Sequence, residues 1–288
     1  MNMSSSALDI LAIAAHRDDV EQTCGGTLLK MAQRGRSTGI LDLTQGEMGT
    51  RGSAKERAAE AVEAARILQV SWRQALDIPD GRVENTWENR LKVARIIREQ
   101  RPRVVILPYW KGRHPDHYTA SVLGYEGCFL AGLAKLGKVG PSSNESGVSD
   151  KSAVRSRESG LSVEAHGFSR GNPSADEQAA LAPVSTLAPH RPFKIVYATL
   201  YYDIRPTFVV DITEQFEARL LSLYAYKSQF TDQAAGANDF PAHAEIRERV
   251  ATMAGFYGLL AGVKYAEPFL QKEVGLFEDL LEIPVKSI

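Results

Sequence analysis

The chain has 288 residues, of which 44% are hydrophobic and 24% are charged. This length and balance are sufficient for one large buried core, or for a domain with an appendage. The formal net charge is −1 at pH 7, so no overall field attracts the protein to nucleic acid or to an anionic membrane, and we expect a small-molecule partner.

The N-terminal part of the chain alternates strand-like and helix-like segments. A continuous apolar run over 8–15 predicts a buried strand, and the small residues over 24–33 predict a helix after it. A second strand over 38–43 leads through a Gly-rich loop into a helical segment over 53–68, in which Ser53 and Glu56 have the spacing of a capping box.

The same alternation continues beyond this helix, with a strand near 74–77, a helix over 87–99 and a strand over 104–109. Repeated strand–helix units are typical of parallel sheets. The sequence therefore predicts an α/β, Rossmann-like fold, with a mostly parallel sheet and helices on both faces.

The character of the chain changes over 138–189, where Ser, Gly and Pro dominate and apolar periodicity is lost, which predicts a flexible insertion. Two strand-like runs over 194–202 and 207–212 follow, and then two helices over 214–227 and 244–262. We expect a single domain over 1–288 that carries this insertion.

The N-terminus and the cysteines limit the location and the chemistry. The first residues have no basic region, and their apolar run is soon interrupted by charge, so neither a signal peptide nor a membrane span is expected and a cytoplasmic protein is predicted. Cys24 and Cys128 form no CxxC pair, which excludes a disulfide framework and a thiolate zinc site. Any metal would be held by His and carboxylate.

Two polar clusters follow two of the predicted strands. His16, Asp18 and Asp19 come directly after the first strand, and His114 and His117 come after the strand over 104–109. The carboxyl ends of parallel strands meet at one edge of a sheet, where ligands usually bind. One such pair is more often a loop hydrogen-bonding device, but two at the same edge favour a site.

These side chains match the needs of a catalytic zinc site, which has about three His or carboxylate ligands and an open position for water. His16, one of the two aspartates, and one of His114 and His117 supply such a set. The unused Asp and His are candidates for a base and for an acid or oxyanion donor.

Other candidate residues have weaker signals. Asp116 could orient a histidine ring through its second nitrogen. Glu47, Arg51 and Arg57 follow the second predicted strand, where an arginine could bind a substrate carboxylate, although such arginines more often face solvent. Tyr202, in the tyrosine-rich run over 197–202, could contribute a hydroxyl to the oxyanion, although strand aromatics are more often packing residues.

The stretches AHRDDVE over 15–21 and HPDH over 114–117 resemble the paired signatures of PIG-L/LmbE-like zinc deacetylases. Arg17 stands where that family usually has Pro. The segments over 40–52, 56–68 and 101–117 resemble, more narrowly, the bacillithiol-pathway deacetylases that act on N-acetylglucosaminyl-malate.

The resemblance implies a role for each motif residue. It implies that His16, Asp19 and His117 bind one Zn²⁺, with Asp18 as the general base that activates water. It further implies that His114 is the partner acid. The implied reaction is hydrolysis of the acetamide of an N-acetylglucosamine conjugate to acetate and a free amino sugar, and the resemblance also implies a homo-oligomer.

The same resemblance implies two contacts around these residues. Asp116 would pair with His114, so that the imidazolium stabilises the oxyanion. Arg51 or Arg57 would bind the malate carboxylates. Three alternatives remain open: a thiol-sugar conjugate amidase of the same family, an iron(II) oxygenase built on two histidines and a carboxylate, and a catalytically inactive sugar-binding module.

Overall fold

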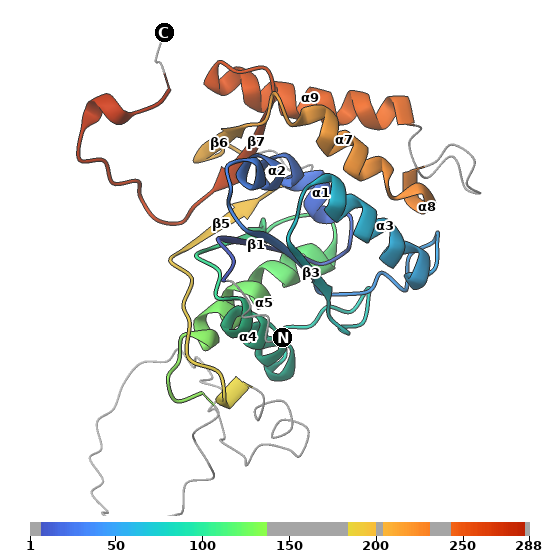
Figure 1. Ribbon diagram of the computed structural model, residues 1–288, viewed down its shortest axis with the longest axis vertical. Helices are drawn as coiled ribbons and strands as arrows, with labels where there is room; N and C mark the ends of the chain where they lie inside the picture. The colour runs from blue at the N-terminus through green and yellow to red at the C-terminus, as the bar shows by residue number, and fades with distance from the viewer. Residues whose placement is uncertain (1–6, 137–183, 200–203, 231–242, 286–288) are drawn as a thin grey trace, which may run out of the picture.

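The computed structural model describes residues 7–136, 184–199, 204–230 and 243–285. These residues form a seven-stranded sheet with the strand order β3-β2-β1-β4-β5-β7-β6 (Figure 1). The strands are β1 (Ile10–Ala14), β2 (Thr38–Asp42), β3 (Trp72–Ala75), β4 (Val104–Pro108), β5 (Lys194–Ala198), β6 (Phe208–Asp211) and β7 (Ala266–Leu270). The helices are α1 (Asp19–Thr23), α2 (Gly25–Gln33), α3 (Ala54–Ile67), α4 (Trp87–Gln100), α5 (Pro115–Ala131), α7 (Phe216–Tyr224), α8 (Lys227–Phe230) and α9 (His243–Ala261), with the short 3-10 helix η1 (Leu280–Glu282) near the end.

The predicted α/β class is confirmed. Strands β3, β2, β1, β4 and β5 are parallel to their neighbours, whereas β7 lies antiparallel between β5 and β6. Helices α4 and α5 cover one face of the sheet, and α1, α2, α3 and α7 lie on the other (Figure 1).

Strand β1 shows why the sheet must be covered twice. Leu11 and Ile13 belong to the core cluster beneath α4 and α5, whereas Ala12 and Ala14 belong to the cluster beneath α1 and α2. A strand with apolar side chains on both faces is stable only when helices cover both faces.

Local signals set the starts of the helices. Ser53 caps α3 as predicted: its Oγ accepts a hydrogen bond from the Glu56 amide at 3.2 Å, and the Glu56 carboxylate accepts from the Ser53 amide at 2.8 Å. Thr86 caps α4 by accepting from the Asn89 amide. Helix α5 begins at Pro115, which fits the first helical position because that position needs no amide donor.

The structure corrects three predictions. Helix α5 and strand β7 are not among the elements predicted from the sequence. The end of the expected insertion over 138–189 belongs to the folded body, because Val184 is buried and its carbonyl accepts from Arg98 at 2.6 Å. Residues 137–183 of that segment lie outside the described residues, and among the described helices none could cross a membrane.

Candidate active site

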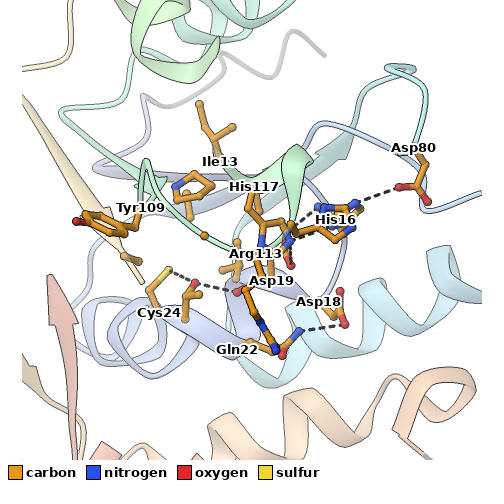
Figure 2. Close-up of a pocket in the computed structure, with 18 of the residues that line it drawn as sticks. Ile13, His16, Asp18, Asp19, Gln22, Cys24, Asp80, Tyr109, Arg113 and His117 are labelled. Carbon is orange, nitrogen blue, oxygen red and sulfur yellow. Dashed lines mark hydrogen bonds and ion pairs between the residues drawn. The ribbon is translucent and has the colours of Figure 1, made fainter. Parts of the chain in front are cut away.

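The two polar motifs meet at the carboxyl edge of the sheet, as predicted. The turn after β1 carries His16, Asp18 and Asp19, and the start of α5 carries His114 and His117. These side chains line a cavity of about 890 Å³ that opens at this edge (Figure 2).

The structure brings together the three residues expected to bind metal. His16 Nδ1 lies 3.2 Å from His117 Nε2 and 3.5 Å from Asp19 Oδ2, and His117 Nε2 lies 3.2 Å from Asp19 Oδ1. Tetrahedral zinc with bonds of about 2.0–2.1 Å holds its ligand atoms roughly 3.3 Å apart. The donor set and its spacing therefore fit such an ion.

Two further groupings of side chains could be considered for a metal, namely His16 with His114 and His117, and His16 with Asp80 and Asp116; their ligand atoms lie within 4.8 Å of one another. We favour the set with Asp19 because every pair in it lies within 3.5 Å. Asp80 and Asp116 instead contact the other ring nitrogen of His16.

His16 is held from behind by two carboxylates. Its Nε2 lies 3.0 Å from Asp80 Oδ1 and 3.3 Å from Asp116 Oδ2. A carboxylate on the far nitrogen fixes the tautomer of a metal-binding histidine and raises its basicity. Asp80 is not among the residues predicted from the sequence, because its loop after β3 has no stronger local signal than the turn sequence Pro-Asp-Gly.

The carboxylates make this position favourable for positive charge. Burial disfavours the charged ring of His16, but Asp19 and Asp80 outweigh that effect and raise its pKa to about 11. Asp19 itself is buried, yet the neighbouring rings of His117 and His16 hold its pKa well below the usual value. A divalent cation bound between these groups would satisfy the same carboxylate charge.

Asp18 lies beside the three proposed metal ligands without joining them. Its carboxylate accepts from Gln22 Nε2 at 3.1 Å and lies 3.6 Å from Arg57 Nη2. Burial, and then the charge of Asp19, raise the pKa of Asp18, whereas Arg57 acts in the opposite direction. A carboxylate with a raised pKa next to a metal position suits a general base.

The expected pairing of Asp116 with His114 is wrong. His114 is the N-cap of α5, and its Nδ1 accepts from the Asp116 amide at 3.2 Å. The Asp116 carboxylate points elsewhere and accepts from the amides of Gly81 at 2.8 Å and Val83 at 3.2 Å. Because Nδ1 is an acceptor, the proton of the neutral His114 ring lies on Nε2. Burial lowers the pKa of His114, which favours this neutral form.

Behind the turn after β1, which carries His16, Asp18 and Asp19 and is called the metal turn below, lies a buried charge cluster of Glu21, Asp42, Arg73 and Tyr226. Arg73 donates to both Asp42 oxygens, at 2.9 and 3.0 Å, and to Glu21 Oε1 at 2.7 Å. Arg73 and Tyr226 also donate to the carbonyl of Arg17, in the turn between His16 and Asp18. The cluster thus fixes the backbone that presents the residues expected to bind metal.

Glu21 is the fully buried carboxyl of this cluster. Its burial raises the pKa of the carboxyl to about 7, although Arg73 acts to lower it.

Arg17, which replaces the usual Pro of the motif, directs its guanidinium away from the cavity and donates from Nη1 to the Ala54 carbonyl at 2.8 Å. No extra cation therefore enters the metal position.

The expected substrate-binding residues are mostly placed elsewhere. Glu47 is exposed, and its carboxylate accepts from the Asp80 amide at 2.8 Å, so it positions the Asp80 loop. Arg51 is buried and lies outside the cavity wall. Arg57 does line the cavity, but it donates to the Gly46 carbonyl at 3.0 Å and lies beside Asp18. Tyr202 lies outside the described residues.

The Arg57 contact depends on a glycine. Gly46 has a φ of 72°, and a Cβ there would lie 2.3 Å from Arg57 Nη1. A glycine permits both the left-handed backbone and the close approach of the guanidinium. The Gly-rich loop therefore places Arg57 beside Asp18 in the cavity wall.

Two cations that are not among the residues predicted from the sequence lie at the cavity mouth. Lys111 and Arg113, in the loop between β4 and α5, are exposed and line the cavity. Within the described part of the chain, neither has a hydrogen bond or ion pair. Their position between a strand end and the HPDH motif is the only signal that could have suggested them.

Comparison with known proteins agrees with this geometry. The family described as PIG-L, GlcNAc-PI de-N-acetylase, matches residues 11–127. The uncharacterized deacetylase YaiS of Escherichia coli K12 is 33% identical over 135 residues, which are 41% of this chain and 72% of that protein. The chain belongs to the PIG-L family.

Two further similarities extend over more of the chain. The diacetylchitobiose deacetylase of Thermococcus kodakarensis is 28% identical over 270 residues, covering 90% of this chain and 80% of that protein. The crystal structure of the conserved protein TT1542 from Thermus thermophilus has a TM-score of 0.69 and 32% identity, covering 95% of this chain and 98% of that one. The prediction of a PIG-L-type deacetylase is thus confirmed.

Proposed function

We propose that this PIG-L protein hydrolyses the acetamide of an N-acetylglucosamine conjugate, releasing acetate and the free amino sugar. The observation that carries the proposal is the grouping of His16, Asp19 and His117 within 3.5 Å of one another, with Asp18 beside them in the same cavity. The diacetylchitobiose deacetylase of Thermococcus kodakarensis supports the sugar class.

We propose Zn²⁺ as the metal, held by His16, Asp19 and His117, because two imidazoles and a carboxylate are a common catalytic zinc set. When bound there, zinc supplies Lewis-acid activation of water and of the amide carbonyl. Asp80 and Asp116 contribute by fixing the ring of His16.

Asp18 and His114 perform the proton and hydrogen-bond steps. Asp18 removes a proton from the attacking water and later returns it to the leaving nitrogen, so that one carboxyl serves both halves of the reaction. The Nε2–H of neutral His114 donates a hydrogen bond to the carbonyl oxygen as negative charge develops there. This role replaces that of an imidazolium paired with Asp116.

For the rest of the substrate we propose N-acetylglucosaminyl-malate, the acetylated precursor in bacillithiol biosynthesis. Malate adds two carboxylates, and the exposed cations of Lys111 and Arg113 lie at the cavity mouth to receive such groups. Arg113 can bind a carboxylate through two parallel N–H donors.

The test is acetate release by purified protein from N-acetylglucosaminyl-malate, N,N'-diacetylchitobiose and plain N-acetylglucosamine. We expect release that requires zinc, stops with chelator and returns when zinc is restored, with the malate conjugate favoured. Metal-dependent release without preference for malate would retain the deacetylase and reject the malate assignment. Cleavage only of a thiol-sugar conjugate would indicate the amidase, and no hydrolysis of any substrate would indicate a binding module.

A further inference from the structure

The last described segment, 274–285, is an apolar arm whose residues are all exposed. It carries seven large apolar side chains: Val274, Leu276, Phe277, Leu280, Leu281, Ile283 and Val285. Leu280 is 81% exposed and Leu281 is 92% exposed. Figure 1 shows the arm in red, leaving β7 and running away from the sheet and its helices. So many contiguous exposed apolar residues are characteristic of an interaction site.

The arm is anchored at its root and locally shaped. Lys272 lies over the rings of Tyr125 at 4.4 Å and Tyr197 at 5.1 Å, and Glu273 pairs with Lys194 at 2.7 Å. Farther along, Asp279 caps η1 by accepting from the Leu281 amide at 2.9 Å. The root therefore fixes where the arm leaves the body, and the cap orders the turn that presents its leucines.

A second exposed apolar surface lies beside this root. The outer face of α5 carries Tyr118, Val122, Tyr125 and Phe129, spaced by four, three and four residues, which places them in one stripe along the helix. All four are exposed, and Phe129 is 53% exposed. We refer to these four residues as the α5 stripe.

The arm and the α5 stripe are complementary in charge as well as in apolar character. Between Val274 and Val285 the arm has three acidic residues and no basic one. One end of the stripe is basic, because the Arg191 guanidinium lies 5.1 Å from the Phe129 ring.

We propose that the arm of one chain packs on the α5 stripe of a second copy of this chain. Within one chain neither surface covers the other, since the apolar side chains of both are exposed. The root of the arm touches Tyr125, in the middle of the stripe, so a two-fold axis near this residue brings each arm across the partner's stripe. Such a reciprocal contact is the isologous arrangement of closed dimers.

Sedimentation of the full chain over a range of concentrations tests the contact. We expect wild type to associate, and both the arm variant Leu280→Ser/Leu281→Ser and the stripe variant Val122→Asp to raise the dissociation constant at least about tenfold. The matched control is Leu259→Ser/Leu260→Ser on α9, which changes two exposed leucines away from the proposed contact. Circular dichroism of each variant checks that the fold is retained.

Cross-linking tests which surfaces meet. A chain with Leu281→Cys, mixed with a chain with Val122→Cys and mildly oxidised, is expected to give a disulfide-linked product of two chains. The native thiols of Cys24 and Cys128 are each only 1% exposed and do not compete. A chain carrying both new cysteines is expected to link to other chains as well.

Several outcomes would overturn the proposal. Wild type that is monomeric at every concentration excludes the contact, and association that survives both variants places the interface elsewhere. Loss of association only on changing the arm rejects α5 as its partner surface. A doubly substituted chain that links only within itself shows that the arm packs on its own stripe.

Discussion

The two sides of the cavity are built on opposite principles. Behind the metal turn, the buried charge cluster satisfies Arg73 through both Asp42 oxygens, Glu21 and the Arg17 carbonyl. At the mouth, Lys111 and Arg113 are exposed and, among the residues described, have no partner. With the function that we propose, the geometry for chemistry is fixed by buried pairs, whereas the groups assigned to substrate choice stay unsatisfied until a ligand binds.

The largest expected effect separates the base from the metal ligands. Asp18→Asn should lower kcat roughly 100- to 10,000-fold, the usual contribution of a general base, while zinc stays bound. His117→Ala should lose zinc, because it removes one of three ligands. Metal content by atomic emission and kcat on the same preparations measure both effects. Equal loss of zinc in the two variants would contradict this division of roles.

The next prediction tests how much the buried charge cluster contributes to the free energy of unfolding. Arg73→Ala should lower the free energy of unfolding by about 3–5 kcal/mol, because Glu21 and Asp42 would remain buried without a counter-charge. Urea unfolding with chelator present measures this without a contribution from metal.

Arg66→Ala is the control for that measurement, since Arg66 pairs with Glu63 on the exposed face of α3 and such pairs contribute little. Similar destabilisation by both variants would remove the distinction between the buried cluster and an ordinary surface pair.

A smaller effect, on zinc affinity, is expected from Asp116, which contacts the proposed ligand His16. Asp116→Asn should weaken zinc binding by about 10- to 100-fold, because the carboxylate that faces His16 Nε2 is lost. Competition with a fluorescent zinc chelator gives the dissociation constant. Asp77→Asn is the matched control, because Asp77 pairs with Lys92 at the surface. Unchanged affinity in Asp116→Asn would show that Asp80 alone orients the ring.

The smallest effect belongs to the open side. Arg113→Ala should raise KM for the malate conjugate by about tenfold, as expected for loss of one charge-assisted contact, with little change in kcat or in KM for plain N-acetylglucosamine. Arg95→Ala on α4, where Arg95 pairs with Glu99, is the control. An equal rise in KM for both substrates would show that Arg113 does not recognise carboxylate.

The parts of the molecule that have a local pattern could be predicted from the sequence. The run over 8–15, the capping box of Ser53 and Glu56, and the two His-containing motifs lead to the sheet and to the edge where the site lies. The parallel order also follows from the alternation of strands and helices, because each crossover needs a helix.

The remaining features depend on contacts between distant segments. Asp80 reaches His16 only because the loop after β3 folds over the β1 turn, and Glu47 holds that loop in place. The position of Arg57 after β2 suggests a substrate contact, but the backbone of Gly46 directs it towards Asp18. The Asp116 carboxylate is oriented by the amides of Gly81 and Val83, a contact between distant segments that residue spacing alone does not reveal.

The buried charge cluster also limits how such a protein can change over generations. Replacing Arg73 leaves the buried carboxylates of Glu21 and Asp42 without a counter-charge, so a gradual exchange that passes through its loss is unstable and favours simultaneous substitutions. Lys111 and Arg113 carry no such dependence and can be exchanged one at a time. With the substrate role that we propose for these two cations, descendants of this chain can acquire new substrates by single mutations while inheriting the turn after β1 unchanged.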